Sequence, residues 1–261
     1  MSDFPDEVLQ VFLNAFRPFP KGVLPDTLAG RVGVSVEDLS GLRARAERDG
    51  FVFESDDDGR WILTDMPDTL APYWVKAGLR CDRLGHQVFF SEEVETTQDI
   101  AFELMAEGRT HGTLVLAEHQ TAGRGRGDRT WVTTPKKSLV FSLLLDLEPP
   151  ETFASVLTVA TATALARAVQ EIADLPARIK FPNDVMVRDK KVAGILLEVR
   201  DYGGELRRAV VGVGINVNQA PEDFPEELRE IATSLKAERR DGAPLRRARL
   251  LRRTLFELEH W

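Results

Sequence analysis

The first 66 residues show short helical patterns separated by turn signals and followed by two strand-like runs. Apolar residues recur every three or four positions in the helical stretches, and Ser35 and Gly50 are typical N-terminal and C-terminal caps of the third one. Two apolar runs around a polar tip then predict a hairpin. The expected elements are helices over 6–17, 25–32 and 36–49 and hairpin strands over 51–53 and 61–63. This order is typical of a winged helix-turn-helix domain over residues 1–66, with residues 67–84 as a proline-containing linker.

From residue 85 onward the pattern changes. Strand-like apolar runs are mixed with helical runs, and polar turns between some of the strands indicate antiparallel hairpins. Such a mixture predicts an α+β domain built on a mixed sheet over residues 85–261. The expected strands are 88–91, 114–118, 139–145, 192–199 and 209–217, the helices are 98–107, 153–172 and 244–261, and the turns are 188–190 and 202–204.

Composition and charge narrow the class of protein. Hydrophobic residues make up 43% of the 261 residues, which excludes a disordered or collagen-like chain. The formal net charge is −8, and residues 1–66 hold 13 acidic and 7 basic side chains, which leaves 29 acidic and 27 basic ones in the rest. An acidic first domain argues against a surface built to coat nucleic acid.

The single cysteine and the two ends of the chain bear on its location. Cys81 has no second cysteine to pair with, so we expect a reducing compartment. The N-terminus lacks the basic start and apolar core of a signal peptide. The longest strongly apolar run, residues 138–147, is too short to cross a bilayer. We therefore expect a cytoplasmic protein that does not enter a membrane.

The first segment with candidate chemistry is QTAGRGRGDRTW at 120–131, directly after an expected strand. Its backbone N–H groups and three arginines suit an anionic ligand such as a phosphate or carboxylate, and Trp131 could stack on a planar ring. The alternative is a flexible, solvated arginine loop. A dinucleotide-binding fingerprint is excluded because Asp128 stands where a third glycine is needed and no helix follows. The chain contains no Walker A sequence.

The second segment, KFPND at 180–184, lies at a proline-directed bend and is followed by KKVAGI at 190–195. Asp184 could hold Mg²⁺, which prefers carboxylate and phosphate oxygens, and Lys180 and Lys191 could neutralise phosphate charge. An ordinary polar turn before the second strand of a hairpin explains the same residues equally well.

Two further segments are weaker by themselves. The glycines of VGVGINVN at 211–218 would let a ligand approach a strand closely, and Asn216 could read the edge of a heterocycle, but a buried strand explains most of the pattern. The segment ETTQ at 95–98 opens a helix, so a threonine N-cap explains it. The functional alternative is a set of hydroxyl and amide groups that bind a small polar ligand.

Taken in chain order, the four segments resemble the motifs of biotin protein ligases. That family has a Ser-Thr-Asn-like segment before a helix, a GRGR-x-G-R-x-W loop, KWPND, K-x-A-G-I-L and G-x-G-x-N, and here the corresponding residues read TTQ, GRGRGDRTW, KFPND, KVAGIL and GVGIN. The resemblance covers roughly residues 85–260, and the winged-helix start matches the longer bacterial members. It implies a class II synthetase-like catalytic domain that uses ATP, Mg²⁺ and biotin. Such a domain forms biotinyl-5'-AMP, releases pyrophosphate, and transfers biotin to a lysine of a biotin carboxyl carrier domain.

The resemblance also implies the roles of individual residues. The biotin-binding positions are Thr96, Thr97, Gln98, Gln120, Arg124, Gly125, Arg126, Lys191 and Gly194. The ATP-binding positions are Arg126, Arg129, Trp131, Lys180, Asn183 and Asn216, with Asp184 as the Mg²⁺ ligand. The expected catalytic residues are Lys191, Arg126 and Arg124. Attack of the biotin carboxylate on the α-phosphate brings two anions together, and this step is accelerated by positioning and charge neutralisation.

Several features depart from the family pattern. Gln98 replaces Asn and moves the amide outward by one methylene, and Phe181 replaces Trp. Asp128 adds a negative charge to the loop, where it could weaken nucleotide binding or pair with a loop arginine. The family usually continues into a small SH3-like barrel, whereas this chain ends at Trp261, so we expect a shortened chain or a member without that cap.

Family members with a winged helix can repress transcription as dimers. Strand-edge homodimers are common in the family, so the resemblance also implies a homodimer. The expected recognition helix, however, begins with Glu37 and Asp38, and the wing tip holds Asp56, Asp57 and Asp58. Because DNA contact needs positive charge on this face, we expect an interaction or regulatory role instead of repression. The alternatives are a biotin-responsive repressor with weak ligase activity, a lipoate or octanoate ligase of the same fold, and an inactive binding module.

Overall fold

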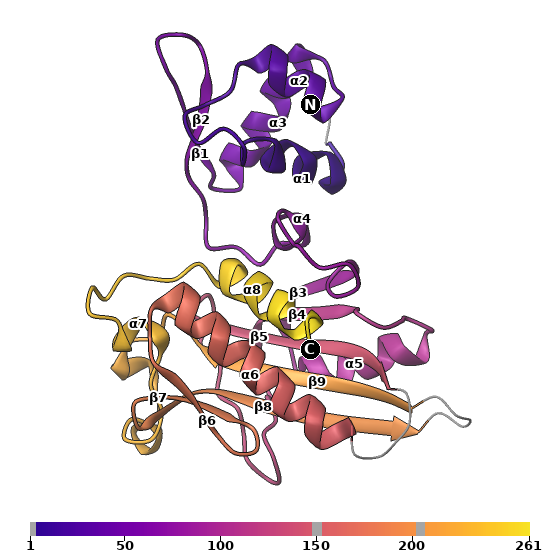
Figure 1. Cartoon of the computed structure of the whole chain (residues 1–261), viewed down its shortest axis with the longest axis vertical. Coiled ribbons are helices and arrows are strands. Elements are labelled where there is room, and N and C mark those ends of the chain that lie inside the picture. The colour runs from indigo at the N-terminus through magenta and orange to yellow at the C-terminus, as the bar shows by residue number, and fades with distance from the viewer. Residues whose placement is uncertain (1–3, 148–152, 202–206) are drawn as a thin grey trace. The chain divides into compact units, whose positions relative to one another are not determined.

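The computed structural model of the chain describes residues 4–147, 153–201 and 207–261. It divides into two compact units, Met1–Gly78 and Leu79–Trp261, which are described separately (Figure 1). The expected turn at 202–204 lies outside the described residues.

Within residues 4–78, the first unit consists of helices around a two-stranded antiparallel hairpin. The elements are α1 Asp6–Ala15, α2 Pro25–Val32, α3 Val36–Arg48, β1 Val52–Ser55, β2 Trp61–Asp65 and α4 Pro72–Lys76. The Ser35 hydroxyl accepts a backbone hydrogen bond from the first turn of α3, and Gly50 adopts a φ of 93° after the helix. The rings of Phe12, Phe16 and Phe53 lie 5.2–5.9 Å apart in the core. The predicted helices, caps and hairpin are confirmed.

Residues 67–78 pack into this unit, whereas the sequence predicts a linker over 67–84. Pro72 stands in the first turn of α4, and this helix packs against α1. The buried ring of Trp74 meets Phe51 edge-on with 4.9 Å between centroids. Aromatic burial holds the segment in place, so the proline that suggests a linker instead begins a packed helix.

Residues 79–84 belong to the second unit. The Glu259 carboxylate accepts hydrogen bonds from the backbone N–H groups of Asp82, Arg83 and Leu84 at 2.6–2.8 Å. Burial raises the pKa of Glu259, but these hydrogen bonds outweigh it, and the pKa is lowered overall. The expected linker is thus divided between two folded units after Gly78.

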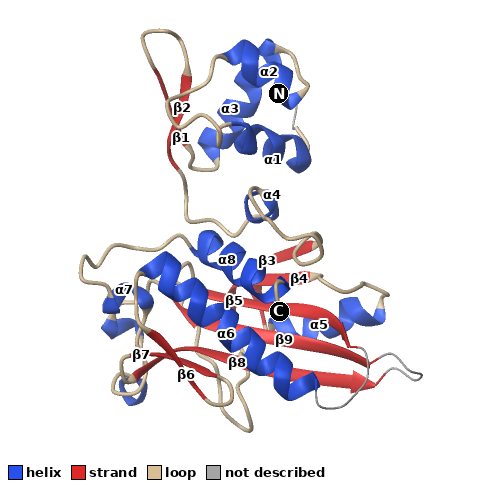
Figure 2. Ribbon diagram, viewed as in Figure 1, coloured by secondary structure: helices blue, strands red, loops and turns tan. Residues whose placement is uncertain are grey.

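Among the described residues, the second unit is built on a seven-stranded mixed sheet of order β3-β4-β5-β9-β8-β7-β6 (Figure 2). The strands are β3 Val88–Val94, β4 Leu114–Gln120, β5 Ser138–Leu147, β6 Ala177–Lys180, β7 Asp184–Val187, β8 Lys190–Asp201 and β9 Arg207–Asn216. β3 and β4 run parallel, and the other neighbouring pairs run antiparallel. The predicted α+β class is confirmed. β6 and β7 have no counterpart among the expected strands because each is only four residues long, and β6 exposes three of its four.

Helices cover both faces of this sheet. α6 (Phe153–Ala173) and α8 (Arg247–Glu259) pack against each other over one face (Figure 1), and α5 (Thr97–Ala106) packs on β4, β5 and β9. Leu144 and Val210 face α5, and Ser142 and Gly212 share that face because side chains alternate along a strand. The short elements η1 Pro221–Asp223, η2 Glu226–Leu228 and α7 Leu235–Glu238 follow β9. The polar site described below lies on the α5 face.

One stretch of α6, Val156–Ala173, is long and apolar enough to cross a membrane by length and composition, the only such stretch in the described part of the chain. It is longer than the apolar run at 138–147 singled out above. Half of it is buried, and α6 packs on β6, β7, β8 and α8. Such burial is typical of a core helix that covers a sheet.

A buried ion pair joins α8 to the sheet. Arg247 is fully buried and donates to both carboxylate oxygens of Glu118 on β4, at 2.6 and 3.1 Å. It also donates to the Ser138 carbonyl at 3.0 Å, and Glu118 accepts from the Lys136 backbone N–H at 3.2 Å. These hydrogen bonds compensate both charges for the loss of water. The pair therefore stabilises the packing of α8 on the sheet.

Candidate functional site

Three glycines on two neighbouring strands form the floor of the site. Gly194 of β8 lies opposite Gly214 of β9, and Gly212 lies two positions earlier on the same face. A Cβ at Gly214 would lie 2.3 Å from the Trp131 ring, and one at Gly212 would lie 2.2 Å from Gln98 Oε1. The missing side chains therefore let Trp131 and Gln98 lie directly on the sheet.

The arginine-rich loop between β4 and β5 folds over this floor. Backbone hydrogen bonds join its two halves, from the N–H of Trp131 to Gly123 and from the N–H of Gly125 to Arg129, at 2.8 and 2.7 Å. A Cβ at Gly123 would lie 2.4 Å from the Trp131 carbonyl oxygen, so this close approach requires glycine. The loop is a narrow ribbon from which the arginine side chains project.

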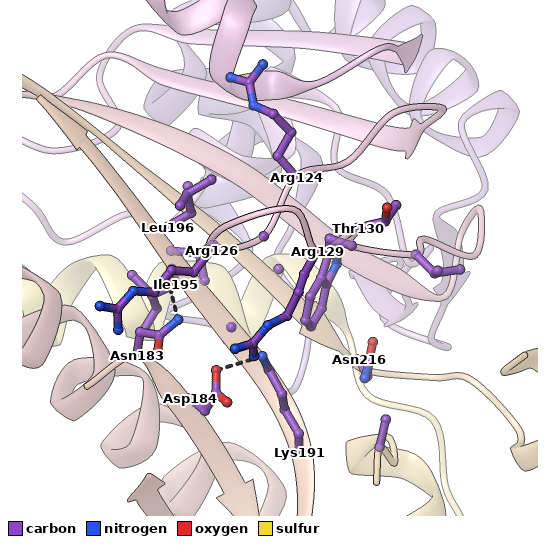
Figure 3. A pocket seen from close by; sticks show the side chains of 18 of the residues that line it. Arg124, Arg126, Arg129, Thr130, Asn183, Asp184, Lys191, Ile195, Leu196 and Asn216 are labelled. Carbon is purple, nitrogen blue, oxygen red and sulfur yellow. Dashed lines mark hydrogen bonds and ion pairs between the residues drawn. The ribbon is translucent and has the colours of Figure 1, made fainter. Parts of the chain in front are cut away.

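Arg124 is turned away from the centre of the site. Its guanidinium donates to both carboxylate oxygens of Asp99 at 2.8 and 2.9 Å and to Glu198 at 3.2 Å. The hydrogen bond with Asp99 raises the pKa of Arg124, which stays a fixed cation. Figure 3 shows its side chain pointing away from Lys191. This geometry favours a structural role, in which Arg124 ties the loop to α5 and β8. It does not favour the catalytic role that the resemblance implies.

Arg126, Arg129 and Lys180 line the site with exposed side chains. Within the described residues, none of these three side chains has a hydrogen-bond or ion-pair partner, and Asp128 pairs with neither arginine. Figure 3 shows Arg126 and Arg129 reaching from the loop toward the side of the site where Lys191 lies on β8. Cations gathered in one hollow focus a positive potential, so the site attracts anions.

Lys191 and Asp184 form an ion pair inside the site. Lys191 Nζ lies 2.6 Å from Asp184 Oδ1 and 5.5 Å from the centroid of the Trp131 ring. The two side chains are only 27% and 17% exposed, so water screens their interaction less than at an open surface. An anion that enters the site competes with Asp184 for the lysine.

Both predicted asparagines are held by the protein. The Asn183 amide donates to the Ile195 carbonyl at 3.1 Å, which fastens the bend before β7 to β8. Asn216 is buried, and its Oδ1 accepts from Gln219 Nε2 at 3.2 Å. Trp131 differs from them, because its buried Nε1–H has no acceptor among the described residues.

A buried polar cluster lies at the N-terminus of α5. The Thr96 hydroxyl accepts from the Gln98 backbone N–H at 3.3 Å, so Thr96 is the helix cap. Gln120 Oε1 accepts from the backbone N–H and the hydroxyl of Thr97 at 2.7 and 3.0 Å. Each of these four side chains is at most 8% exposed. They offer a ligand hydrogen-bonding groups that are shielded from bulk water.

All fifteen residues singled out from the sequence line one cavity of about 400 Å³, a size that suits a small ligand. Their individual roles stay predictions. The sequence did not point to the segment 224–232, which lines the same cavity through Phe224, Leu228, Glu230, Ile231 and Ala232. This segment reaches the site through a parallel bridge between Lys191 and Ala232. It carries no local motif, so only the tertiary structure could reveal it.

Comparison with protein families gives a match to the biotin/lipoate A/B protein ligase family over residues 90–216. This segment contains every one of the fifteen residues.

Individual relatives agree with the family match. The bifunctional ligase/repressor BirA of Bacillus subtilis is 36% identical over 188 residues, which cover 72% of this chain and 58% of the relative. The biotin–[acetyl-CoA-carboxylase] ligase of Mycobacterium tuberculosis is 35% identical over 54% of this chain and 51% of its own length. The chain thus spans between half and two thirds of the length of these curated relatives. The solved structure of the biotin protein ligase from Aquifex aeolicus in complex with biotin and ATP is 32% identical, with a TM-score of 0.56 over 67% of this chain and 69% of that one.

Proposed function

Because the chain belongs to the biotin/lipoate A/B protein ligase family, we propose that it is an ATP-dependent biotin protein ligase. In the first step, a biotin carboxylate oxygen attacks the α-phosphorus of ATP, so biotinyl-5'-AMP forms and pyrophosphate leaves. In the second step, a lysine amine of a biotin carboxyl carrier domain attacks the mixed anhydride, so an amide forms and AMP leaves. The observation that carries this proposal is the convergence of four cationic side chains and a buried amide cluster on one cavity.

The cations of the cavity account for the first step. Lys191 can leave Asp184 and bind the biotin carboxylate together with the α-phosphate, which reduces the repulsion between two anions. Arg126, Arg129 and Lys180 face the remaining phosphate charge from the mouth of the cavity. No side-chain nucleophile takes part, so catalysis rests on positioning and electrostatic stabilisation.

The residues present also fit a bound Mg²⁺. In the described part of the chain, no three His, Cys, Asp or Glu side chains cluster as a metal site, and Asp184 is one of three carboxylates, with Asp189 and Glu230, that line the cavity. Mg²⁺ is often held by one or two carboxylates, water and substrate phosphates, so Asp184 is sufficient as the protein ligand. A bound Mg²⁺ would neutralise phosphate charge there.

The proposal is tested by two assays. Pyrophosphate release from biotin and ATP reports the first step, and covalent transfer of labelled biotin to a carrier domain reports the second. Lipoate and octanoate serve as competing substrates, because the matched family includes lipoate ligases. Exclusive transfer of lipoate or octanoate would replace this proposal, and biotin binding without pyrophosphate release would indicate a binding module.

The glycine floor gives a steric prediction. Replacing Gly214 by alanine places a Cβ 2.3 Å from the Trp131 ring, so the indole must move off the sheet. We expect the Kd values for biotin and ATP, measured by calorimetry, to rise at least about tenfold, which corresponds to 1.4 kcal/mol. The melting temperature should stay nearly constant because Gly214 has no positive φ.

Gly30→Ala is the matched control for this substitution. A Cβ at Gly30 meets no atom within 4 Å, and the residue lies in α2 of the first unit. Alanine is the better helix former, so this variant should bind both ligands as the unaltered chain does. Unchanged ligand affinity in Gly214→Ala would show that the indole does not need its place on the glycine floor.

We further propose that the first unit is a winged helix that does not act as a DNA-binding domain. The arginines of α3 are largely occupied: Arg43 donates to Glu47 at 2.8 Å and lies over the Trp61 ring, and Arg45 donates to Asp6. On the hairpin, Arg60 pairs with Asp56 and Asp58. Internal contacts therefore use the positive charge that phosphate binding needs.

This reading predicts weak, non-specific DNA binding. In a gel shift with the chain's own promoter at about 150 mM salt and with biotinyl-5'-AMP present, we expect a Kd no tighter than about 10⁻⁶ M. A variant with Glu37→Lys and Asp57→Lys removes negative charge from the helix start and the hairpin tip, and should bind any DNA more tightly. Specific binding of the promoter by the unaltered chain would favour the repressor alternative.

A further inference from the structure

Ser142 lies behind the cavity and contacts two of the side chains that line it. It is fully buried on β5, and its hydroxyl lies 2.8 Å from Thr97 Oγ1 and 3.0 Å from Gln98 Oε1. Thr97 and Gln98 line the cavity, whereas Ser142 does not. Ser142 can therefore affect a ligand only through these neighbours.

Backbone groups set the orientation of both amides in this cluster. Gln98 Nε2 donates to the carbonyls of Leu196 and Val210 at 3.3 and 3.4 Å, so its Oε1 faces Ser142. Gln120 accepts from the Thr97 backbone N–H at 2.7 Å, so the accepting atom is its oxygen. Turning either amide over would place like groups against each other.

Two hydroxyl hydrogens serve three contacts in this cluster. The contacts run from Gln120 Oε1 to Thr97 Oγ1, on to Ser142 Oγ and then to Gln98 Oε1, at 3.0, 2.8 and 3.0 Å. Amide oxygens only accept, and each hydroxyl donates one hydrogen. The contact between the two hydroxyls needs a hydrogen between its oxygens. Both hydroxyl hydrogens therefore point in the same direction along this row of hydrogen bonds, either toward Gln98 or toward Gln120. One terminal amide oxygen is then left without a hydroxyl donor.

We propose that Ser142 is a positioning residue for the ureido ring of biotin. Its hydroxyl couples Thr97 to Gln98, so that the cluster presents one amide oxygen, of Gln98 or Gln120, to a ligand N–H. The two hydroxyls reverse their direction according to which oxygen the ligand uses. This inference rests on the proposed function, because it assumes that the ligand carries N–H donors.

Gln98 makes this coupling possible. Its side chain is one methylene longer than that of Asn, and this length lets the amide reach Ser142 on β5 and the carbonyls of β8 and β9 together. The two hydrogen bonds to those carbonyls are long. Without Ser142, they alone would hold the amide over Gly212.

The test measures biotin binding to the full chain by calorimetry for four proteins: unaltered, Ser142→Ala, Gln98→Asn and the double variant. We expect the Kd of Ser142→Ala to rise about tenfold, as for the loss of one buried hydrogen bond. Gln98→Asn should show a similar rise. The double variant should bind no more weakly than either single one, because both changes break the same coupling. At saturating biotin, the kcat of Ser142→Ala should stay within about threefold of the unaltered value.

Ser138→Ala is the matched control on the same strand. Ser138 is equally buried, but its hydroxyl bonds to the Thr134 N–H and to Gln219, away from the α5 cluster. Its loss should leave the biotin Kd unchanged, even where the melting temperature falls as much as in Ser142→Ala. Equal biotin affinity in Ser142→Ala and the unaltered chain would overturn the inference. A double variant whose rise in biotin Kd equals the product of the rises in Ser142→Ala and Gln98→Asn would overturn it as well. Failure of the unaltered chain to bind biotin would overturn the proposed function itself, and this inference with it.

Discussion

Replacing Lys191 by alanine is expected to slow pyrophosphate release from biotin and ATP by about 10²–10³-fold, the usual effect of removing one group that stabilises developing charge. Lys191 Nζ lies 3.1 Å from the place of a Cβ at Gly194 on the glycine floor, 2.6 Å from Asp184 and 5.5 Å from the Trp131 centroid. Without it, the biotin carboxylate and the α-phosphate meet beside an unpaired carboxylate. Single-turnover pyrophosphate release at saturating substrates measures this loss directly.

Two companion variants separate the possible causes. Lys190→Ala removes the same charge one residue earlier, where Nζ donates to the Arg229 carbonyl at 2.7 Å, and should change the rate by less than about threefold. Adding Asp184→Asn to Lys191→Ala removes the uncovered carboxylate together with the proposed Mg²⁺ ligand, and we expect the rate to stay low. Recovery in that double variant, or an unchanged rate in Lys191→Ala, would remove Lys191 from the catalytic step.

Replacing Glu118 by alanine is expected to lower the stability of the second unit by about 3–5 kcal/mol. Arg247 would keep its guanidinium fully buried but would lose the carboxylate that accepts from both of its terminal nitrogens. A buried charge without its counterion is far from water and poorly compensated. Thermal unfolding, followed by circular dichroism, should show a fall of roughly 10 °C for a unit of this size.

An exposed ion pair on the same helix provides the control. Arg253 of α8 lies 2.7 Å from Glu171, whose side chain is 50% exposed. Glu171→Ala should therefore cost under about 1 kcal/mol. Combining Glu118→Leu with Arg247→Met removes both buried charges and should recover much of the loss. A melting temperature equal to that of the unaltered chain in Glu118→Ala would show that the remaining contacts of Arg247 compensate its charge.

Local signals along the chain predicted much of the fold correctly. Helical spacing and the cap at Ser35 depend on neighbours within a few residues, and the structure confirms them. These local sequence signals gave wrong or missing predictions where tertiary packing determines the secondary structure. Pro72 suggests a linker but begins α4, because Trp74 packs on Phe51. β6 and β7 are short, and the pairing of β6 with β7 and of β7 with β8 gives them strand geometry that four residues alone do not specify.

The sequence by itself determined the family, through the order and spacing of its motifs, and with it the fifteen residues around the cavity. Such motifs are contiguous, so they can be read without knowing which strands are neighbours. Only the tertiary structure decided how these residues are used. Packing of α5 on the sheet places Ser142 against Gln98 and Arg124 beside Asp99, and packing of α8 brings Arg247 to Glu118 across 129 positions of the chain. Contacts at such separations depend on the register and packing of the whole sheet, which no local pattern encodes.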